Sequence, residues 1–158
     1  MNMEKKFELT DNFIINAFGV KLFQIKCTKS FKYAKEGDLG GYVEKDENLD
    51  QESDAWVSGN AQVSGNARVY GNARVSGDAE IDNNNKHCGF DCFGSANRHT
   101  HAYLTKENKV EITCGCFRGS IEEFEKRVEE THSGTIYEKQ YKAIIDVLKI
   151  KFGLTDLI

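Results

Sequence analysis

Most residues that could do chemistry lie in the C-terminal half of the chain. They are cysteines and histidines, at Cys88, Cys92, His99, His101, Cys114, Cys116 and His132. Thiolate and imidazole are the usual ligands of structural zinc, most often with two residues between paired cysteines. The cysteine spacings here are Cys-x3-Cys and Cys-x-Cys. We therefore interpret the cysteines as buried small side chains rather than ligands, and we expect neither a metal nor another cofactor.

A hairpin decides how these side chains are arranged. The stretch HAYLTKENKVEITCGCF (101–117) predicts two strands joined around residues 106–108. A three-residue loop pairs Leu104 with Val110 and places the apolar side chains on one face, together with Cys114 and Cys116. A two-residue loop would put both histidines beside the cysteines but would divide the apolar side chains between two faces. Burial of apolar surface favours the three-residue loop.

The opposite face of the hairpin is expected to be open. Arginine and aromatic side chains bind anionic or nucleotide-like ligands through bidentate hydrogen bonds and stacking. The predicted ligand-binding residues are Arg98, His99, His101, Tyr103, Glu111 and Arg118, with no catalytic residue among them. The alternative is an ordinary solvated sheet face. The pair Cys114 and Cys116 could also form a redox couple, although nothing in the sequence indicates an activated thiol.

A six-residue repeat must position this hairpin. Five units follow one another from residue 54 to residue 83: DAWVSG, NAQVSG, NARVYG, NARVSG and DAEIDN. A period of six fits neither a helix nor a continuous strand, but it fits a short strand followed by a turn. Three such sides close a triangular coil in which residue i lies beside residue i+18. The repeat therefore predicts a short left-handed parallel β-helix rather than a disordered linker.

This stacking makes specific pairings testable. Trp56 is expected beside Arg74, both facing outwards, and Gln62 beside Glu80. The aliphatic positions, which line the inside, are Val57, Val63, Val69, Val75 and Ile81. Upstream, Val43 and Leu49 fall in the register of the small alanine position, which indicates that a weaker repeat begins earlier.

Five units make fewer than two full coils, which is short for an independent stack. The ends must be covered by flanking segments or by other subunits. We expect a homo-oligomer, with a trimer favoured over a dimer.

Both flanks carry recognisable elements. Before the repeat, residues 20–27 (VKLFQIKC) predict a strand, and the glycine-rich stretch that follows predicts a sharp turn. After the hairpin, Ser120 with Glu123 and Thr135 with Glu138 predict capping boxes of two helices, the second ending near Gly153. The expected fold is mainly β, with an N-terminal β cap (1–47), a short β-helix (48–83) and a C-terminal α+β module (84–158).

One resemblance adds a biological setting. The stretch LFQIKCTKSFKYAKEGDLGGYVEKDENL, followed by W-V-x-G-N-A repeats, resembles phage and prophage accessory proteins that join a Gly-Asp-Leu-Gly-Gly segment to hexapeptide-like repeats. The C-terminal CGCFRGSIEEFEKRVEETH is similar to a module of small phage proteins. The resemblance covers about residues 22–81 and implies an architecture and a setting in the cytoplasm of a bacterial host, but no reaction.

Composition narrows the function further. The formal charge of −4 over 158 residues gives no chain-wide basic field for nucleic acid, which we do not expect as a partner. No apolar run is long enough to cross a bilayer, so we expect no membrane partner. We expect a non-enzymatic binding protein for a small anionic or nucleotide-like ligand, as in phage counter-defence. The alternatives are a scaffold that binds and inhibits a host or phage protein, and a hexapeptide-repeat acyltransferase.

Overall fold

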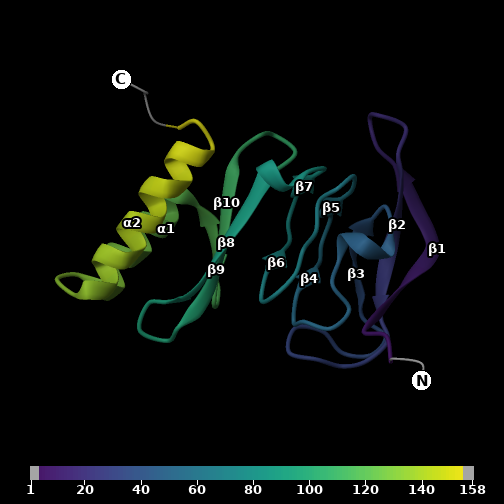
Figure 1. Cartoon of the computed structure of the whole chain (residues 1–158), viewed down its shortest axis with the longest axis horizontal. Coiled ribbons are helices and arrows are strands. Elements are labelled where there is room, and N and C mark those ends of the chain that lie inside the picture. The colour runs from purple at the N-terminus through teal and green to yellow at the C-terminus, as the bar shows by residue number, and fades with distance from the viewer. Residues whose placement is uncertain (1–3, 155–158) are drawn as a thin grey trace.

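The chain is arranged as successive layers along its long axis. The computed structural model describes residues 4–154. Strands from the N-terminal part lie at one end, the repeat segment (residues 55–81) in the middle, and a C-terminal sheet followed by two helices at the other end (Figure 1). Residues 1–3 of the predicted N-terminal cap and residues 155–158 of the predicted C-terminal module lie outside the described residues.

The N-terminal part is a three-stranded antiparallel arrangement. Its strands are β1 (Phe7–Ile15), β2 (Lys21–Cys27) and β3 (Leu39–Val43). The strand predicted over residues 20–27 is confirmed, whereas β1 was not anticipated. The predicted sharp turn in the glycine-rich stretch is wrong where β3 forms. A Cβ atom on Gly40 would lie 2.6 Å from Cγ1 of Ile25 and 2.7 Å from the carbonyl oxygen of Val57, so glycine lets this strand lie against its neighbours.

The repeat forms two-residue strands joined by glycine turns. These strands are β4 (Trp56–Val57), β5 (Gln62–Val63), β6 (Arg74–Val75) and β7 (Glu80–Ile81). Two of the turn glycines, Gly65 and Gly77, have φ of +59° and +62°, which favours glycine over any residue with a side chain. Strand β4 pairs with β6 in parallel, and β5 pairs with β7 in parallel. The predicted pairs Trp56–Arg74 and Gln62–Glu80 are therefore confirmed.

The predicted fold class, a mainly β protein built on a short left-handed parallel β-helix, is wrong. Within residues 4–154 the chain forms mixed sheets with two C-terminal helices, and no left-handed parallel β-helix is formed. The five-stranded sheet has the order β1-β2-β3-β5-β7, so the parallel strands of the repeat continue an antiparallel one. The N-terminal strands thus extend a sheet of the repeat, because two-residue strands offer too little pairing to stand alone.

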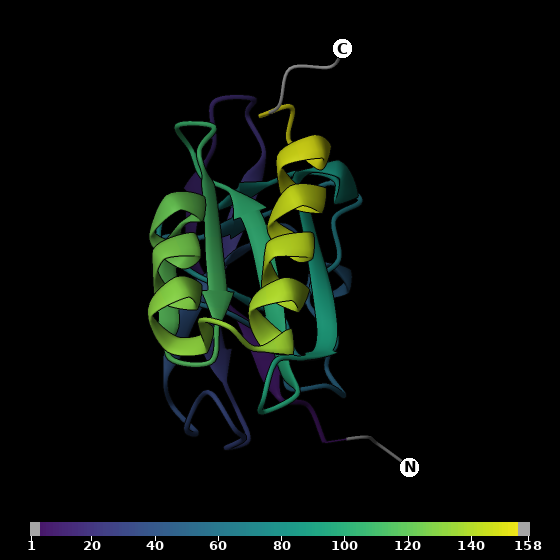
Figure 2. The same ribbon diagram turned by 90° about the vertical axis from the view of Figure 1, so that its left-hand side faces the viewer.

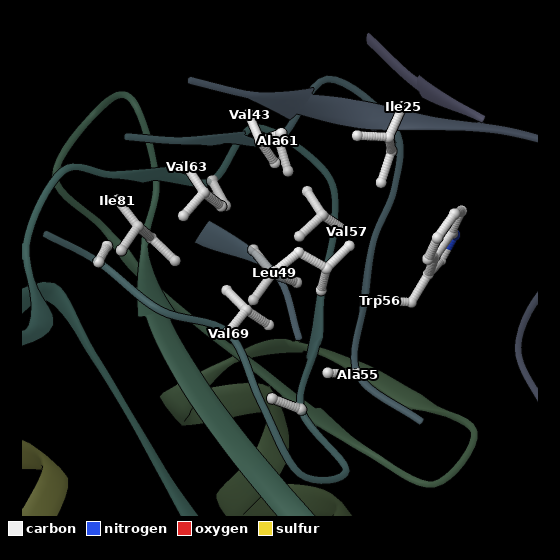
Figure 3. Close-up of a cluster of buried hydrophobic side chains, with 14 of the residues drawn as sticks. Ile25, Val43, Leu49, Ala55, Trp56, Val57, Ala61, Val63, Val69 and Ile81 are labelled. Atoms are coloured by element: carbon white, nitrogen blue, oxygen red, sulfur yellow. The ribbon is translucent and has the colours of Figure 1, made fainter. Parts of the chain in front are cut away.

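The upstream end of the repeat also has a different phase from the one expected. Val43 pairs with Val63, and Leu49 with Val69, each at a spacing of twenty residues. Both side chains therefore occupy the aliphatic position and not the alanine position. The irregular segment between Leu49 and Ala55 supplies the extra residues. All these side chains gather in one buried cluster (Figure 3).

The C-terminal part is an antiparallel sheet covered by two helices. The hairpin register predicted from a three-residue loop is confirmed, because Leu104 faces Val110 and Ala102 faces Ile112. The sheet has the order β11-β10-β9-β8. Its elements are β8 (His87–Phe93), β9 (Arg98–Leu104), β10 (Val110–Cys114), β11 (Phe117–Ser120), α1 (Ile121–His132) and α2 (Ile136–Lys151).

Both predicted helices are present, side by side on one face of this sheet (Figure 2). The capping box of Ser120 and Glu123 is confirmed. At the second helix Thr135 accepts a hydrogen bond from the backbone N–H of Glu138, and the reciprocal bond of a full box is not formed. The helices bury Phe124, Ile145 and other apolar side chains against the sheet.

The C-terminal sheet is therefore covered on two sides. Ala102 and Ile112 belong to the core under the helices, whereas Tyr103 belongs to the core of the repeat. On the repeat side, the hydroxyl of Thr113 donates to the backbone carbonyl of Arg74. This hydrogen bond holds the repeat against the C-terminal sheet, so side chains from both parts line the surface along their boundary.

Candidate functional site

The hairpin face predicted to be open is covered by the repeat. His101, Tyr103 and Thr113 are buried, and the Tyr103 hydroxyl lies 3.4 Å from the hydroxyl of Ser76 in the repeat. Burial raises the pKa of Tyr103 well above its ordinary value. The reason for the difference is that the alternating pattern identifies two faces of a strand but does not tell which neighbour covers the polar one.

The two predicted arginines remain exposed at opposite edges of this covered face. Arg98 lines a hollow of about 370 Å³ between the repeat and the sheet. Arg118 lines a second hollow of about 480 Å³ along the same boundary. Tyr33, Arg74 and Thr113 line both hollows, which therefore form one groove; we call it the basic groove.

Arg74 lies at the centre of the basic groove. Its guanidinium carbon is 4.7 Å from the centre of the Tyr33 ring, and its Nη2 donates to the backbone carbonyl of Gly115. Trp56 packs instead on Phe31, with ring centres 5.3 Å apart, and is buried. The expected outward stacking of Trp56 on Arg74 is therefore wrong. In the loop of residues 31–33, Phe31 covers the tryptophan, and the ring of Tyr33 stacks on the arginine instead.

Uncompensated positive charge gathers at one end of the groove. Lys32, Arg74 and Arg98 line the smaller hollow, and no carboxylate lines it. None of these three forms an ion pair within residues 4–154. Asn72 and Asn97 add amide groups to the same wall. Three cations with free hydrogen-bond donors favour an anionic ligand.

Glu111 and Arg118 are engaged with one another. The Nε atom of Arg118 lies 2.6 Å from Oε1 of Glu111, which also accepts a hydrogen bond of 2.9 Å from Tyr103. Glu111 therefore orients the tyrosine and the arginine rather than pointing freely into solvent. The Arg98 end of the groove has no such carboxylate.

His99 and His101 belong to a continuous chain of hydrogen-bonded side chains. Oδ1 of Asp91 lies 2.6 Å from Nδ1 of His99, and Nε2 of His99 lies 3.0 Å from Nδ1 of His101. Nε2 of His101 lies 3.0 Å from Nδ1 of His87. Nε2 of His87 in turn lies 3.0 Å from Oδ1 of Asn84. We call these five residues the imidazole chain.

Burial sets the charge of the imidazole chain. His101 is 4% exposed and His87 is 6% exposed. Desolvation lowers the pKa of His87 to about 4 and holds that of His101 well below its usual range. His99 lines both the basic groove and a separate hollow of about 400 Å³. Both of its ring nitrogens lie within hydrogen-bonding distance of neighbouring side chains, Asp91 and His101.

Cys114 and Cys116 differ in burial, although both were expected to be buried on one face of the hairpin. Cys114 is buried beneath the helices as predicted, but Cys116 is exposed and lines the basic groove. The prediction for Cys116 fails because Gly115, with φ of +57°, ends the alternation of the strand before it reaches residue 116. Within residues 4–154, no group of three or more histidine, cysteine, aspartate or glutamate side chains is arranged to hold a metal ion.

Several residues of the site were not anticipated from the sequence. Lys32 and Tyr33 come from a loop that carries no local motif, and nothing in the sequence places them there. Asp91 and Asn84 complete the imidazole chain. The sequence did place Arg74 beside Trp56 in register. Because neighbouring side chains of a strand point to opposite faces, and Val75 points inward, the pattern also indicated that Arg74 faces a surface.

No family model matches the sequence, and no curated protein matches it either. Among the helices of the described residues, none is both long and apolar enough to cross a membrane.

Proposed function

We propose that this protein is a non-enzymatic binding protein for a small phosphate-bearing, nucleotide-like ligand, which occupies the basic groove. The observation that carries the proposal is the cluster of Lys32, Arg74 and Arg98 without a paired carboxylate. Arginine forks bind phosphate oxygens in pairs, and a dianionic phosphate compensates charges that the protein leaves open.

The size and the aromatic lining of the groove support a ligand larger than phosphate. Its two hollows, of about 370 and 480 Å³, fall in the range of small-molecule sites. Tyr33 and the exposed Leu39 line the larger hollow and offer apolar surface to a base. A phosphate at Arg98 and a base toward Leu39 would occupy both hollows.

The biological setting of the proposal comes from the resemblance to phage accessory proteins. A phage protein that captures a nucleotide signal in the bacterial cytoplasm would remove it from a host defence pathway. A homo-oligomer, with a trimer favoured over a dimer, belongs to the same proposal.

Native mass spectrometry of the purified protein tests the proposal directly. A co-purified adduct of nucleotide mass, one for each chain, is the expected result, and isothermal calorimetry with ADP as the probe provides the affinity. Arg98→Ala should abolish the adduct and ADP binding while leaving subunit number unchanged. The matched control is Arg127→Ala on α1, an exposed arginine over Phe117 on the helix side.

Three results would contradict the proposal. The first is equal ADP affinity in the wild type and Arg98→Ala. The second is that the wild type shows neither a co-purified anionic adduct in native mass spectrometry nor ADP binding in calorimetry. The third is turnover of acetyl-CoA, which would favour the acyltransferase alternative.

A second candidate function rests on the β1–β2 hairpin. Ile15 and Phe18 at its tip are 64% and 79% exposed, which is unusual for apolar side chains of this size. This surface supports the alternative of a scaffold that binds a host or phage protein. Phe18→Ser should then abolish capture of that protein while leaving ADP binding unchanged.

A further inference from the structure

The imidazole chain ends at both sides on a hydrogen-bond acceptor. One end is the carboxylate of Asp91. The other is the side-chain oxygen of Asn84, whose orientation is fixed because this oxygen accepts from the backbone N–H of Arg68 at 3.1 Å. The amide nitrogen of Asn84 donates to the carbonyl of Asn66 at 3.3 Å. Neither end of the chain can therefore supply a proton to it.

Counting protons shows what this arrangement needs. The chain has four contacts between side chains, and each contact requires one N–H proton. Three neutral imidazoles carry one N–H each, which leaves one contact without a proton whichever tautomers are chosen. One added proton satisfies all four contacts. A second added proton would set two N–H groups against each other.

We propose that Asp91, His99, His101, His87 and Asn84 form one proton-binding site, which takes up a single proton shared among the three imidazoles. The proton adds to the unpaired ring nitrogen at the open contact, and no bond between heavy atoms changes. At each contact between two rings, the N–H proton can pass from one ring nitrogen to the lone pair of the next. The positive charge can therefore move along the chain. The site goes beyond the proposed ligand binding and does not depend on it.

The charged surroundings favour the Asp91 end for this charge. Asp91 is the only carboxylate lining the adjacent hollow, which Arg68 and Lys151 also line. Burial disfavours the charge on both His87 and His101, and Lys151 of α2 adds to this effect at His87. Cys88 lies beside the chain as a thiol, since burial raises its pKa. From the neighbouring strands, neutral Thr113 faces His101 and Tyr103 faces His87.

Proton uptake would act on the contact between the repeat and the C-terminal sheet. Asn84 bonds the backbone of residues 66 and 68 in the repeat, and His87 begins the sheet. When the chain lacks its proton and the open contact falls at Asn84, two lone pairs face each other there. The added proton restores that bond, so uptake of the one shared proton strengthens this local contact between the repeat and the sheet.

Nitrogen-15 NMR of histidine-labelled protein tests the proposal on the unmodified chain. The ring nitrogens of His87, His99 and His101 should shift together with one common midpoint, and their summed change should equal one proton. His132, which stacks on Tyr141 away from the chain, is the internal control for general effects of pH on the spectrum. Three separate midpoints, or one histidine titrating while the others stay unchanged, would overturn the proposal.

A substitution checks the role of the carboxylate. Asp91→Asn should lower the common midpoint by at least about one pH unit, because an adjacent carboxylate favours the charged imidazole by that amount or more. Asp91→Glu keeps the charge and should restore most of the midpoint. Asp11→Asn, on the distant β1 strand, is the matched control. An unchanged midpoint in Asp91→Asn would contradict the shared site.

Discussion

The guanidinium carbon of Arg74 lies 4.7 Å from the centre of the Tyr33 ring. This contact joins a residue of the repeat to the loop before β3, and the same arginine donates to the carbonyl of Gly115 in the C-terminal sheet. Arg74 thus connects three parts of the chain at the centre of the basic groove. One face of its planar group is taken by the ring, and the rest of the fork faces the groove.

Replacing Arg74 by lysine separates charge from geometry. Arg74→Lys keeps the positive charge but loses the planar fork and the stacking on Tyr33. We expect ADP affinity to fall about tenfold, equivalent to about 1.4 kcal/mol, measured by calorimetry. Arg68→Lys, in the hollow beside the imidazole chain, is the control and should leave the affinity unchanged. Unchanged affinity in Arg74→Lys would mean that charge alone holds the ligand.

Ligand binding should protect Cys116 from alkylation. Cys116 and Cys92 are both exposed, but only Cys116 lines the basic groove. With saturating ADP, iodoacetamide should modify Cys116 several-fold more slowly, while Cys92 reacts at its unliganded rate. Peptide mass spectrometry over time measures both rates in one sample. Equal slowing of both cysteines would indicate a general effect of ADP and not occupancy of the groove.

Acid should destabilise the fold through His87. Burial lowers the pKa of His87 to about 4 and so opposes a second proton on the imidazole chain, whereas each histidine of the unfolded chain binds its own proton, so the unfolded chain binds more protons between about pH 6.5 and 4. The free energy of unfolding therefore falls as the pH is lowered from about 6.5 to about 4, by up to roughly 3 kcal/mol from this residue. Urea unfolding at several pH values should show a smaller loss in His87→Gln than in the wild type.

The control for this pH effect is His132→Gln, which lies on the helices. It should keep the acid sensitivity of the wild type. If His87→Gln loses stability with pH as steeply as the wild type, the histidine is not the group responsible.

Truncation of an aliphatic repeat position should be costly. Ile81 is 1% exposed and pairs with Val63 inside the repeat cluster, whereas Ile136 is 64% exposed at the start of α2. Ile81→Ala should lower the free energy of unfolding by about 2–5 kcal/mol. Ile136→Ala should stay within about 0.5 kcal/mol. Chemical denaturation compares the two, and similar losses would contradict the inward position of Ile81.

The strongest sequence patterns predicted local structure well. The apolar phase of the hairpin determined its register, since a slip would have moved Ile112 from the core under the helices to the opposite face of the sheet. The spacing of eighteen residues placed Trp56 beside Arg74. These predictions held because each rests on residues close in sequence or on a strictly periodic set.

Predictions that required knowing the neighbours of an element failed. The repeat pattern did not reveal that β3 joins it to antiparallel strands, because that pairing depends on the close approach at Gly40. The polar face of the hairpin was predicted to be open, whereas the repeat covers it, and nothing local to His101 or Tyr103 indicates that cover. Lys32 and Tyr33 reach the groove only through the path of a loop, which has no periodicity to interpret.

The stacking of β4 on β6 and of β5 on β7 at eighteen residues has a consequence for how such a chain can change in evolution. Its two ends are held by different partners, since β3 precedes β5 and Ala79 bridges to Thr105 beyond β7. Duplicating three hexads would add eighteen residues, which keeps the pairing spacing and leaves both boundaries intact. Length could then grow in steps of eighteen residues, while gain or loss of a single hexad would change which strands pair.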